Sequence, residues 1–181
     1  MTLSMNRPFC LWLMTALLAG GAVVGAGESL RIVPIVHVDD VLVSFELADA
    51  YTKDVREGIA SGLRTTFTYN VELRMVGSLW VDRTIAAVVV SASDQYDNLT
   101  RRHILSRVVD GRVEEASVTE DESVVRQWLT TVVRLPLSTT SKLDSSRDYY
   151  VRITARSRPY SASLLGRGNA VTGTTKFTFV P

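Results

Sequence analysis

Apolar and polar residues alternate with a period of two through most of the chain. The clearest case is Thr66–Met75, where the apolar side chains share one face and the polar side chains share the other. This alternation is typical of a strand with one buried face. Similar patterns predict further strands at Leu30–Val38, Val41–Leu47, Thr84–Ser93, His103–Val109, Arg112–Val118, Tyr149–Arg156 and Lys176–Val180. We therefore expect about eight strands, mostly sequential and antiparallel.

The segment that follows Tyr51 has the spacing of a short amphipathic helix. Thr52 is a residue type that favours the N-cap, and Val55, Ile59 and Leu63 fall on one helical face. We expect this face to pack against a sheet.

A second helix is predicted over residues 119–134. Thr119 and Glu122 have the spacing of a capping box, an apolar stripe follows, and Pro136 is expected to end the helix. Residues 157–174 are expected to form a loop. The predicted fold is mainly β (α+β), an antiparallel β-sandwich-like sheet with two packed helices, after an N-terminal signal segment.

Residues 1–26 have the three parts of a secretory signal. Arg7 precedes an uncharged apolar stretch over residues 8–27, and Val24 and Ala26 are small side chains that suit cleavage. The stretch is also long enough for an uncleaved membrane anchor. We expect a periplasmic or secreted protein with one domain over residues 27–181, and a membrane-anchored form as the alternative.

Composition and charge narrow the possible functions. The 181 residues include 20 Lys and Arg against 19 Asp and Glu, so no excess of basic residues predicts nucleic-acid binding. Cys10 falls in the signal segment, and His37 and His103 fall in predicted strands without the spacing of metal ligands. The sequence also lacks a nucleophile elbow and a phosphate loop with its lysine. We expect no enzymatic activity, no cofactor and no metal site.

Carboxylates are the remaining route to catalysis. Asp39, Asp40, Asp82 and Asp94 are the candidates for an unfamiliar enzyme, a function that we rank below binding. Asp94 and Asp97 lie near each other in an oxygen-rich stretch, but the glycine and closing glutamate of a calcium loop are missing. A solvated turn is therefore predicted there.

Arg152, Arg156 and Arg158 fall on one side of a predicted strand near the C-terminus. Such a row can bind an anionic surface of a protein partner. It can also be a solvated strand face that protects a sheet edge against aggregation, which is the more frequent role. We take these arginines as the candidate partner site.

Several short segments share their pattern with a known family. They are Val41–Leu47, Val55 with Glu57 and Ile59, Phe67–Leu73, Trp80 with Asp82, Tyr96–Thr100, Tyr149–Arg152 and Phe177–Pro181. On these residues the chain resembles the bacterial domain of unknown function DUF4390. The resemblance implies an exported cell-envelope protein with a link to envelope signalling, and it supplies no catalytic or binding residues. Residues 157–173 depart from the family's pattern.

These observations predict a non-enzymatic, exported cell-envelope protein that acts as a protein-interaction module with an envelope protein as partner. The alternative is a small-ligand or lipid-binding β domain with a cavity between the sheet and helix 119–134. Contact with a membrane is expected only through residues 8–27, if the signal stays uncleaved.

Overall fold

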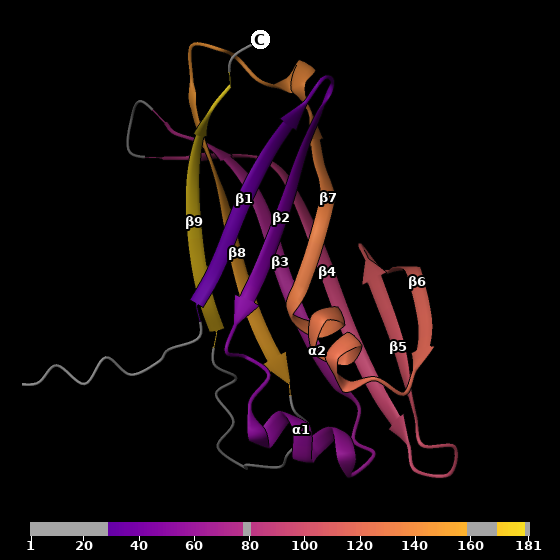
Figure 1. The fold of residues 1–181 in the computed structure, drawn as a ribbon. Helices are drawn as coiled ribbons and strands as arrows, with labels where there is room; N and C mark the ends of the chain where they lie inside the picture. The colour runs from indigo at the N-terminus through magenta and orange to yellow at the C-terminus, as the bar shows by residue number, and fades with distance from the viewer. Residues whose placement is uncertain (1–28, 78–80, 159–169, 180–181) are drawn as a thin grey trace, which may run out of the picture.

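The computed structural model describes residues 29–77, 81–158 and 170–179 (Figure 1). The predicted signal segment and Trp80 lie outside these residues. The elements are β1 (Ser29–His37), β2 (Asp40–Ala48), α1 (Lys53–Ala60), β3 (Thr65–Met75), β4 (Arg83–Asp97), β5 (Arg102–Val109), β6 (Arg112–Thr119), α2 (Glu122–Thr130), β7 (Thr131–Thr139), a short 3-10 helix (Thr140–Lys142), β8 (Asp148–Arg158) and β9 (Ala170–Thr178).

The strands form two antiparallel sheets that pack face to face. One sheet has the order β1-β2-β7, and the other has the order β6-β5-β4-β3-β8-β9. The rings of Phe45 in β2 and Tyr69 in β3 join the two sheets, with centroids 4.9 Å apart. The prediction of a mainly β, sandwich-like fold with two helices is confirmed.

The alternating sequence pattern explains the core. In β3, the apolar side chains of Phe67, Tyr69, Val71 and Leu73 are all fully buried, whereas the polar side chains between them are only half-buried. β2 contributes a matching buried face from the opposite sheet. Because one side chain in two points inward along a strand, this pattern determines which face of each sheet is covered.

The second helix is shorter than the predicted span 119–134, which was wrong at both ends. α2 begins after Asp121, whose carboxylate accepts a hydrogen bond from the Ser123 backbone N–H at 2.7 Å. Thr119 is the last residue of β6, so the expected capping box with Glu122 does not form. Strand pairing with β5 holds Thr119 in extended backbone, so the N-cap of α2 is Asp121, two residues later.

Residues that were expected to continue this helix instead form β7. The strand pairs with β2, and it buries Val132, Leu135 and Leu137 against the core. Pro136 is tolerated because β7 is an edge strand, where a missing backbone N–H costs no ladder hydrogen bond on the open side.

Residues 157–174, expected to be a loop, are strand at both ends. β8 continues to Arg158, β9 begins at Ala170, and Arg156 pairs with Ala170. The described residues therefore contain nine strands, one more than the pattern predicted.

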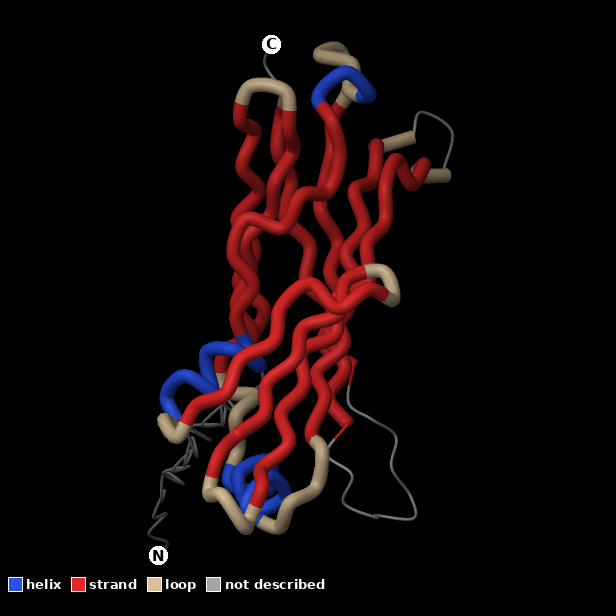
Figure 2. Tube along the Cα trace, turned by 90° about the vertical axis from the view of Figure 1, so that its right-hand side faces the viewer, coloured by secondary structure: helices blue, strands red, loops and turns tan. Residues whose placement is uncertain are grey.

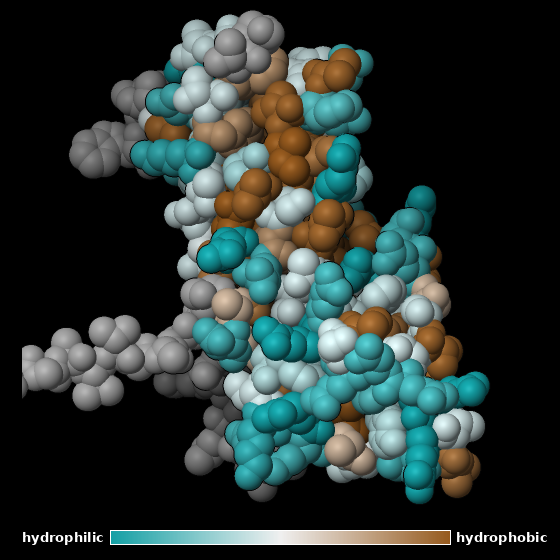
Figure 3. All heavy atoms as spheres, in the orientation of Figure 1, coloured by the Kyte–Doolittle hydropathy of each residue, from teal (hydrophilic) through white to brown (hydrophobic). Residues whose placement is uncertain are grey.

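Both α-helices lie toward the same end of the strand layers, and the 3-10 helix lies at the opposite end (Figure 2). Figure 3 shows apolar side chains gathered over the three-stranded sheet and hydrophilic side chains around the helices. Within the part of the chain that the structure covers, no helix is long and apolar enough to cross a bilayer.

Candidate functional site

The predicted arginine row lies on the outer face of the six-stranded sheet, the face turned away from the three-stranded sheet. Arg152 and Arg156 are exposed and alternate with the buried Val151, Ile153 and Ala155 along β8. Arg158 belongs to the same strand, but its side chain lies outside the described residues. The structure thus brings Arg152 and Arg156 to one face, as the sequence predicted.

Positive charge exceeds negative charge around these arginines. Glu72, opposite Arg152 in the sheet, lies 4.0 Å from Arg152 and 3.4 Å from Arg74. One carboxylate therefore serves two guanidinium groups. Arg156 has Thr68 and Ala170 as its cross-strand neighbours, and none of the described carboxylates pairs with it.

The rest of this outer face is polar in the middle and apolar at the far edge. Hydroxyl groups line the middle, where Thr68 of β3 and Ser91 of β4 lie 3.5 Å apart. Toward β5 and β6, Ile104, Val113 and Val118 have exposed fractions of 51%, 68% and 58%. The three-stranded sheet and α2 cover the other side of the six-stranded sheet. None of the described elements covers the outer face, so it is accessible to a partner.

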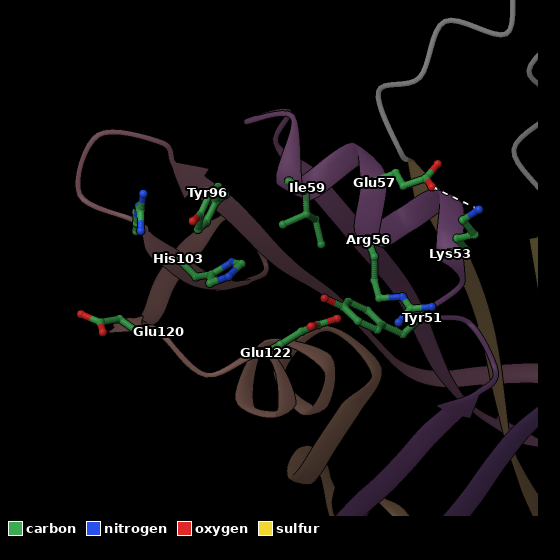
Figure 4. Close-up of a pocket in the computed structure, with 11 residues that line it drawn as sticks. Tyr51, Lys53, Arg56, Glu57, Ile59, Tyr96, His103, Glu120 and Glu122 are labelled. Carbon is green, nitrogen blue, oxygen red and sulfur yellow. Dashed lines mark ion pairs between the residues drawn. The ribbon is translucent and has the colours of Figure 1, made fainter.

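A cleft of about 600 Å³ opens between α1, the adjoining ends of β4 and β5, and the start of α2 (Figure 4). We call it the α1–α2 cleft. Its lining includes Tyr51, Arg56, Ile59, Tyr96, His103 and Glu122. A neighbouring pocket of about 470 Å³ shares Tyr51, Arg56 and Glu122 with it. The cleft lies at the N-terminal end of α2, and not beneath the helix, where Val125 and Leu129 are fully buried.

A buried carboxylate in contact with an imidazole lies beside the α1–α2 cleft. Asp94 in β4 is fully buried, and its Oδ2 lies 2.9 Å from Nδ1 of His103 in β5. Burial raises the pKa of Asp94, and its contacts with His103 oppose this effect. The His103 ring packs against Tyr96, with centroids 4.7 Å apart. Because neighbouring strands hold all three residues, the imidazole has a fixed place in the wall of the cleft.

Tyr51 lies between the two helices of the cleft. Burial raises the pKa of Tyr51 to about 12, and the negative charges of Glu122 and Asp94 and a hydrogen bond to Glu122 contribute to this shift. The phenol therefore keeps its proton at neutral pH. Figure 4 shows Tyr51, Arg56 and Glu122 pointing toward one another from the segment before α1, from α1 and from α2.

The four carboxylates considered for catalysis do not meet. Asp39 and Asp40 lie at the turn between β1 and β2, whereas Asp82 and Asp94 lie near opposite ends of β4. Asp82 accepts a hydrogen bond from the Tyr150 hydroxyl at 2.6 Å, and this bond lowers the pKa of Asp82. These positions give no shared carboxylate centre.

The prediction of a solvated turn was right for Asp97 and wrong for Asp94. Asp97 accepts hydrogen bonds from the Leu99 backbone N–H at 2.9 Å and from the Thr100 hydroxyl at 2.8 Å. Asp94 belongs to the inward face of β4, because its side chain follows the alternation of the buried Val90 and Ala92. In the described ranges, no three potential ligands among His, Cys, Asp and Glu gather as a metal site would require.

Sequence reasoning did not identify the α1–α2 cleft. Tyr51, Arg56 and Glu122 belong to separate segments, and no local spacing connects them. Asp94 did carry a usable indication, since an acidic residue at an inward position of an alternating strand predicts a buried carboxylate that needs a partner.

Comparisons with known proteins identify a family. No curated protein and no solved structure matches the chain. Residues 28–174 match the domain of unknown function DUF4390, which spans nearly all of the described residues. Because this match covers most of its length, the chain belongs to the DUF4390 family.

Proposed function

We propose that this protein is a non-enzymatic, exported cell-envelope protein that binds an acidic protein partner. The contact surface is the outer face of the six-stranded sheet, and Arg152 and Arg156 of β8 are its principal charged contacts. The observation that carries this proposal is the position of both arginines on a sheet face that no other described element covers.

The chemistry of the face supports an acidic partner. Arg74, Arg152, Arg156 and Lys176 share it with Glu72 and Asp82, so positive charge is in excess. Arginine suits interfaces because its planar guanidinium group binds carboxylates through two hydrogen bonds. The exposed valines and isoleucine toward β6 add apolar area that a partner can bury.

Export is supported by the sequence of residues 1–26, with its basic start, apolar middle and small-residue end. A partner that resides in the cell envelope follows from export. The sheet itself is a rigid platform, because its central strands have neighbours on both sides.

Crosslinking in cells tests this function. The full-length protein, tagged after Pro181, is crosslinked in its native host, purified and analysed by mass spectrometry. We expect one acidic envelope protein whose yield falls strongly in the double variant Arg152→Glu/Arg156→Glu. The matched control is Arg31→Glu, because Arg31 is an exposed arginine in a strand of the other sheet.

The two variants decide the outcome. Loss of the partner in the double variant, together with normal capture by Arg31→Glu, supports the surface. Equal capture by the wild type and the double variant would overturn it, as would an equal loss with Arg31→Glu. Circular dichroism of each purified variant checks that the fold is intact.

A further inference from the structure

The α1–α2 cleft has walls of opposite charge. Arg56 projects from α1 and Glu122 projects from α2, and both also line the neighbouring pocket. The ion pairs of the described residues do not include one between Arg56 and Glu122. The cleft therefore presents a cation and an anion that do not neutralise each other by direct contact.

Most other charges of the cleft are already paired. Lys53 lies 3.5 Å from Glu57 along α1, as the dashed line in Figure 4 marks. Glu120 lies 2.9 Å from Arg102. Arg101, at the turn between β4 and β5, is a further cation at the rim. Glu122 accepts a hydrogen bond from the Tyr51 hydroxyl, but none of the described ion pairs includes Glu122 or Arg56, so these two opposed charges are left available to a ligand.

We propose that the α1–α2 cleft binds a small zwitterion that carries a free ammonium group and a free carboxylate, as amino acids and short peptides do. The ligand carboxylate binds Arg56, and the ligand ammonium group binds Glu122. Hydrogen bonds between oppositely charged groups are the strong ones, and they gain strength where water is partly excluded. Tyr51, between the two charges, keeps its hydroxyl proton and donates a hydrogen bond to Glu122, which helps to orient that carboxylate in the cleft.

The size and lining of the cleft fit this class of ligand. Pockets for small molecules are typically about 300–1,000 Å³, and the cleft holds about 600 Å³. Ile59 and the ring of Tyr96 provide apolar surface for a ligand side chain. The adjoining pocket, which shares both charged residues, leaves space for a second residue of a peptide.

This site is independent of the proposed partner surface. His103 and Tyr96 belong to the inward-facing side chains of β5 and β4, whereas Arg152 and Arg156 point outward from β8. Ligand binding is therefore expected to be unchanged in Arg152→Glu/Arg156→Glu. A failure of one proposal leaves the other standing.

Calorimetry on the purified protein tests the ligand class. The probes are the single amino acids, a set of dipeptides, and the N-acetylated and C-amidated forms of the tightest binder. We expect saturable binding of at least one zwitterion. The dissociation constant of each blocked form should be higher by a factor of about ten or more, because a charge-assisted hydrogen bond is lost.

Two variants test which side chain binds which end of the ligand. Binding of the N-acetylated ligand should be insensitive to Glu122→Gln, because the ammonium group is already absent. Binding of the C-amidated ligand should be insensitive to Arg56→Gln for the corresponding reason. Both side chains are exposed, so the fold should tolerate either change. Arg112→Gln and Glu114→Gln on the exposed strand β6 are the matched controls.

Three results would overturn the assignment. The first is the absence of saturable binding for every amino acid and dipeptide. The second is an affinity that does not change when either end of the ligand is blocked. The third is binding to phosphatidylethanolamine vesicles alone, which would show that the cleft takes a lipid headgroup and not an amino acid.

Discussion

Asp94 Oδ2 and His103 Nδ1 lie 2.9 Å apart, while the second oxygen of the same carboxylate has no hydrogen-bond partner in the described part of the chain. The carboxylate is fully buried, whereas the imidazole reaches the α1–α2 cleft. A buried carboxylate with one satisfied oxygen is costly when charged. This cost raises the pKa of Asp94 above its ordinary value of 3.8.

Asp94→Asn should remove a pH dependence of stability. Because the pKa is raised in the folded state, the native protein still holds the Asp94 proton at a pH where the unfolded chain has lost it. The free energy of unfolding therefore falls as the pH rises through the folded pKa. The asparagine cannot ionise, so the variant should gain stability relative to the wild type as the pH increases from 3.8 toward neutrality. Urea unfolding at several pH values measures the difference.

Asp97→Asn is the control with the opposite sign. Hydrogen bonds from the Leu99 N–H and the Thr100 hydroxyl lower the pKa of Asp97. The contribution of Asp97 to stability is present above the pKa of the unfolded chain, and it is lost as the pH falls through the pKa of the folded protein. A difference between Asp94→Asn and the wild type that stays constant with pH would contradict the raised pKa of Asp94.

Leu129→Ala should destabilise the protein by about 2–5 kcal/mol, the cost of a cavity in a packed core. Leu129 is 0% exposed, and its backbone carbonyl accepts a hydrogen bond from the Tyr69 hydroxyl at 2.5 Å. The control is Val133→Ala, because Val133 is 65% exposed and its truncation should change stability by about 0.5 kcal/mol or less. Equal losses in thermal or chemical unfolding would argue against close packing of α2.

Two glycine-to-alanine changes should have opposite effects. Gly111 has a φ of +83° in the turn between β5 and β6, so Gly111→Ala should cost about 1 kcal/mol through backbone strain. Gly58 lies within α1, where Gly58→Ala should stabilise the protein by about 0.4–1 kcal/mol. A new Cβ meets nothing within 4 Å at either position, so steric contact is not involved. Unfolding midpoints of both variants provide the measurement.

We expect the mature protein to begin at Gly27. The small side chains at Val24 and Ala26 suit signal peptidase, so intact-mass analysis of the protein from its native host should show the loss of residues 1–26. Full-length mass in the membrane fraction would support the anchored alternative. Substitution of Ala26 by a bulky residue should block the cleavage.

The strands were predictable because the period of two is imposed by burial on one face. β3 follows this rule over its whole length. β7 was missed because Val132 and Val133 extend the apolar stripe of α2, so the local pattern fits a helix as well as a strand. Pairing with β2, which lies far away in the sequence, decides in favour of the strand.

The two sites differ in how far the sequence revealed them. Arg152 and Arg156 could be placed on one face because both belong to a single alternating strand. The α1–α2 cleft could not be predicted, because Arg56 and Glu122 face each other only in the folded protein. There the two helices lie at the same end of the sheets (Figure 1). A cleft of this kind arises from tertiary structure and has no local signature.

The pairing of early with late strands has a consequence for folding. β2 pairs with β7, and β3 pairs with β8, so Thr66 pairs with Arg158, a residue about half the chain length away in the sequence. Neither sheet can be completed before these late segments are available, and such non-local pairing slows folding. Until then, the hydrogen-bonding edges of β2 and β3 are open to other chains, which makes a partly folded molecule prone to aggregation.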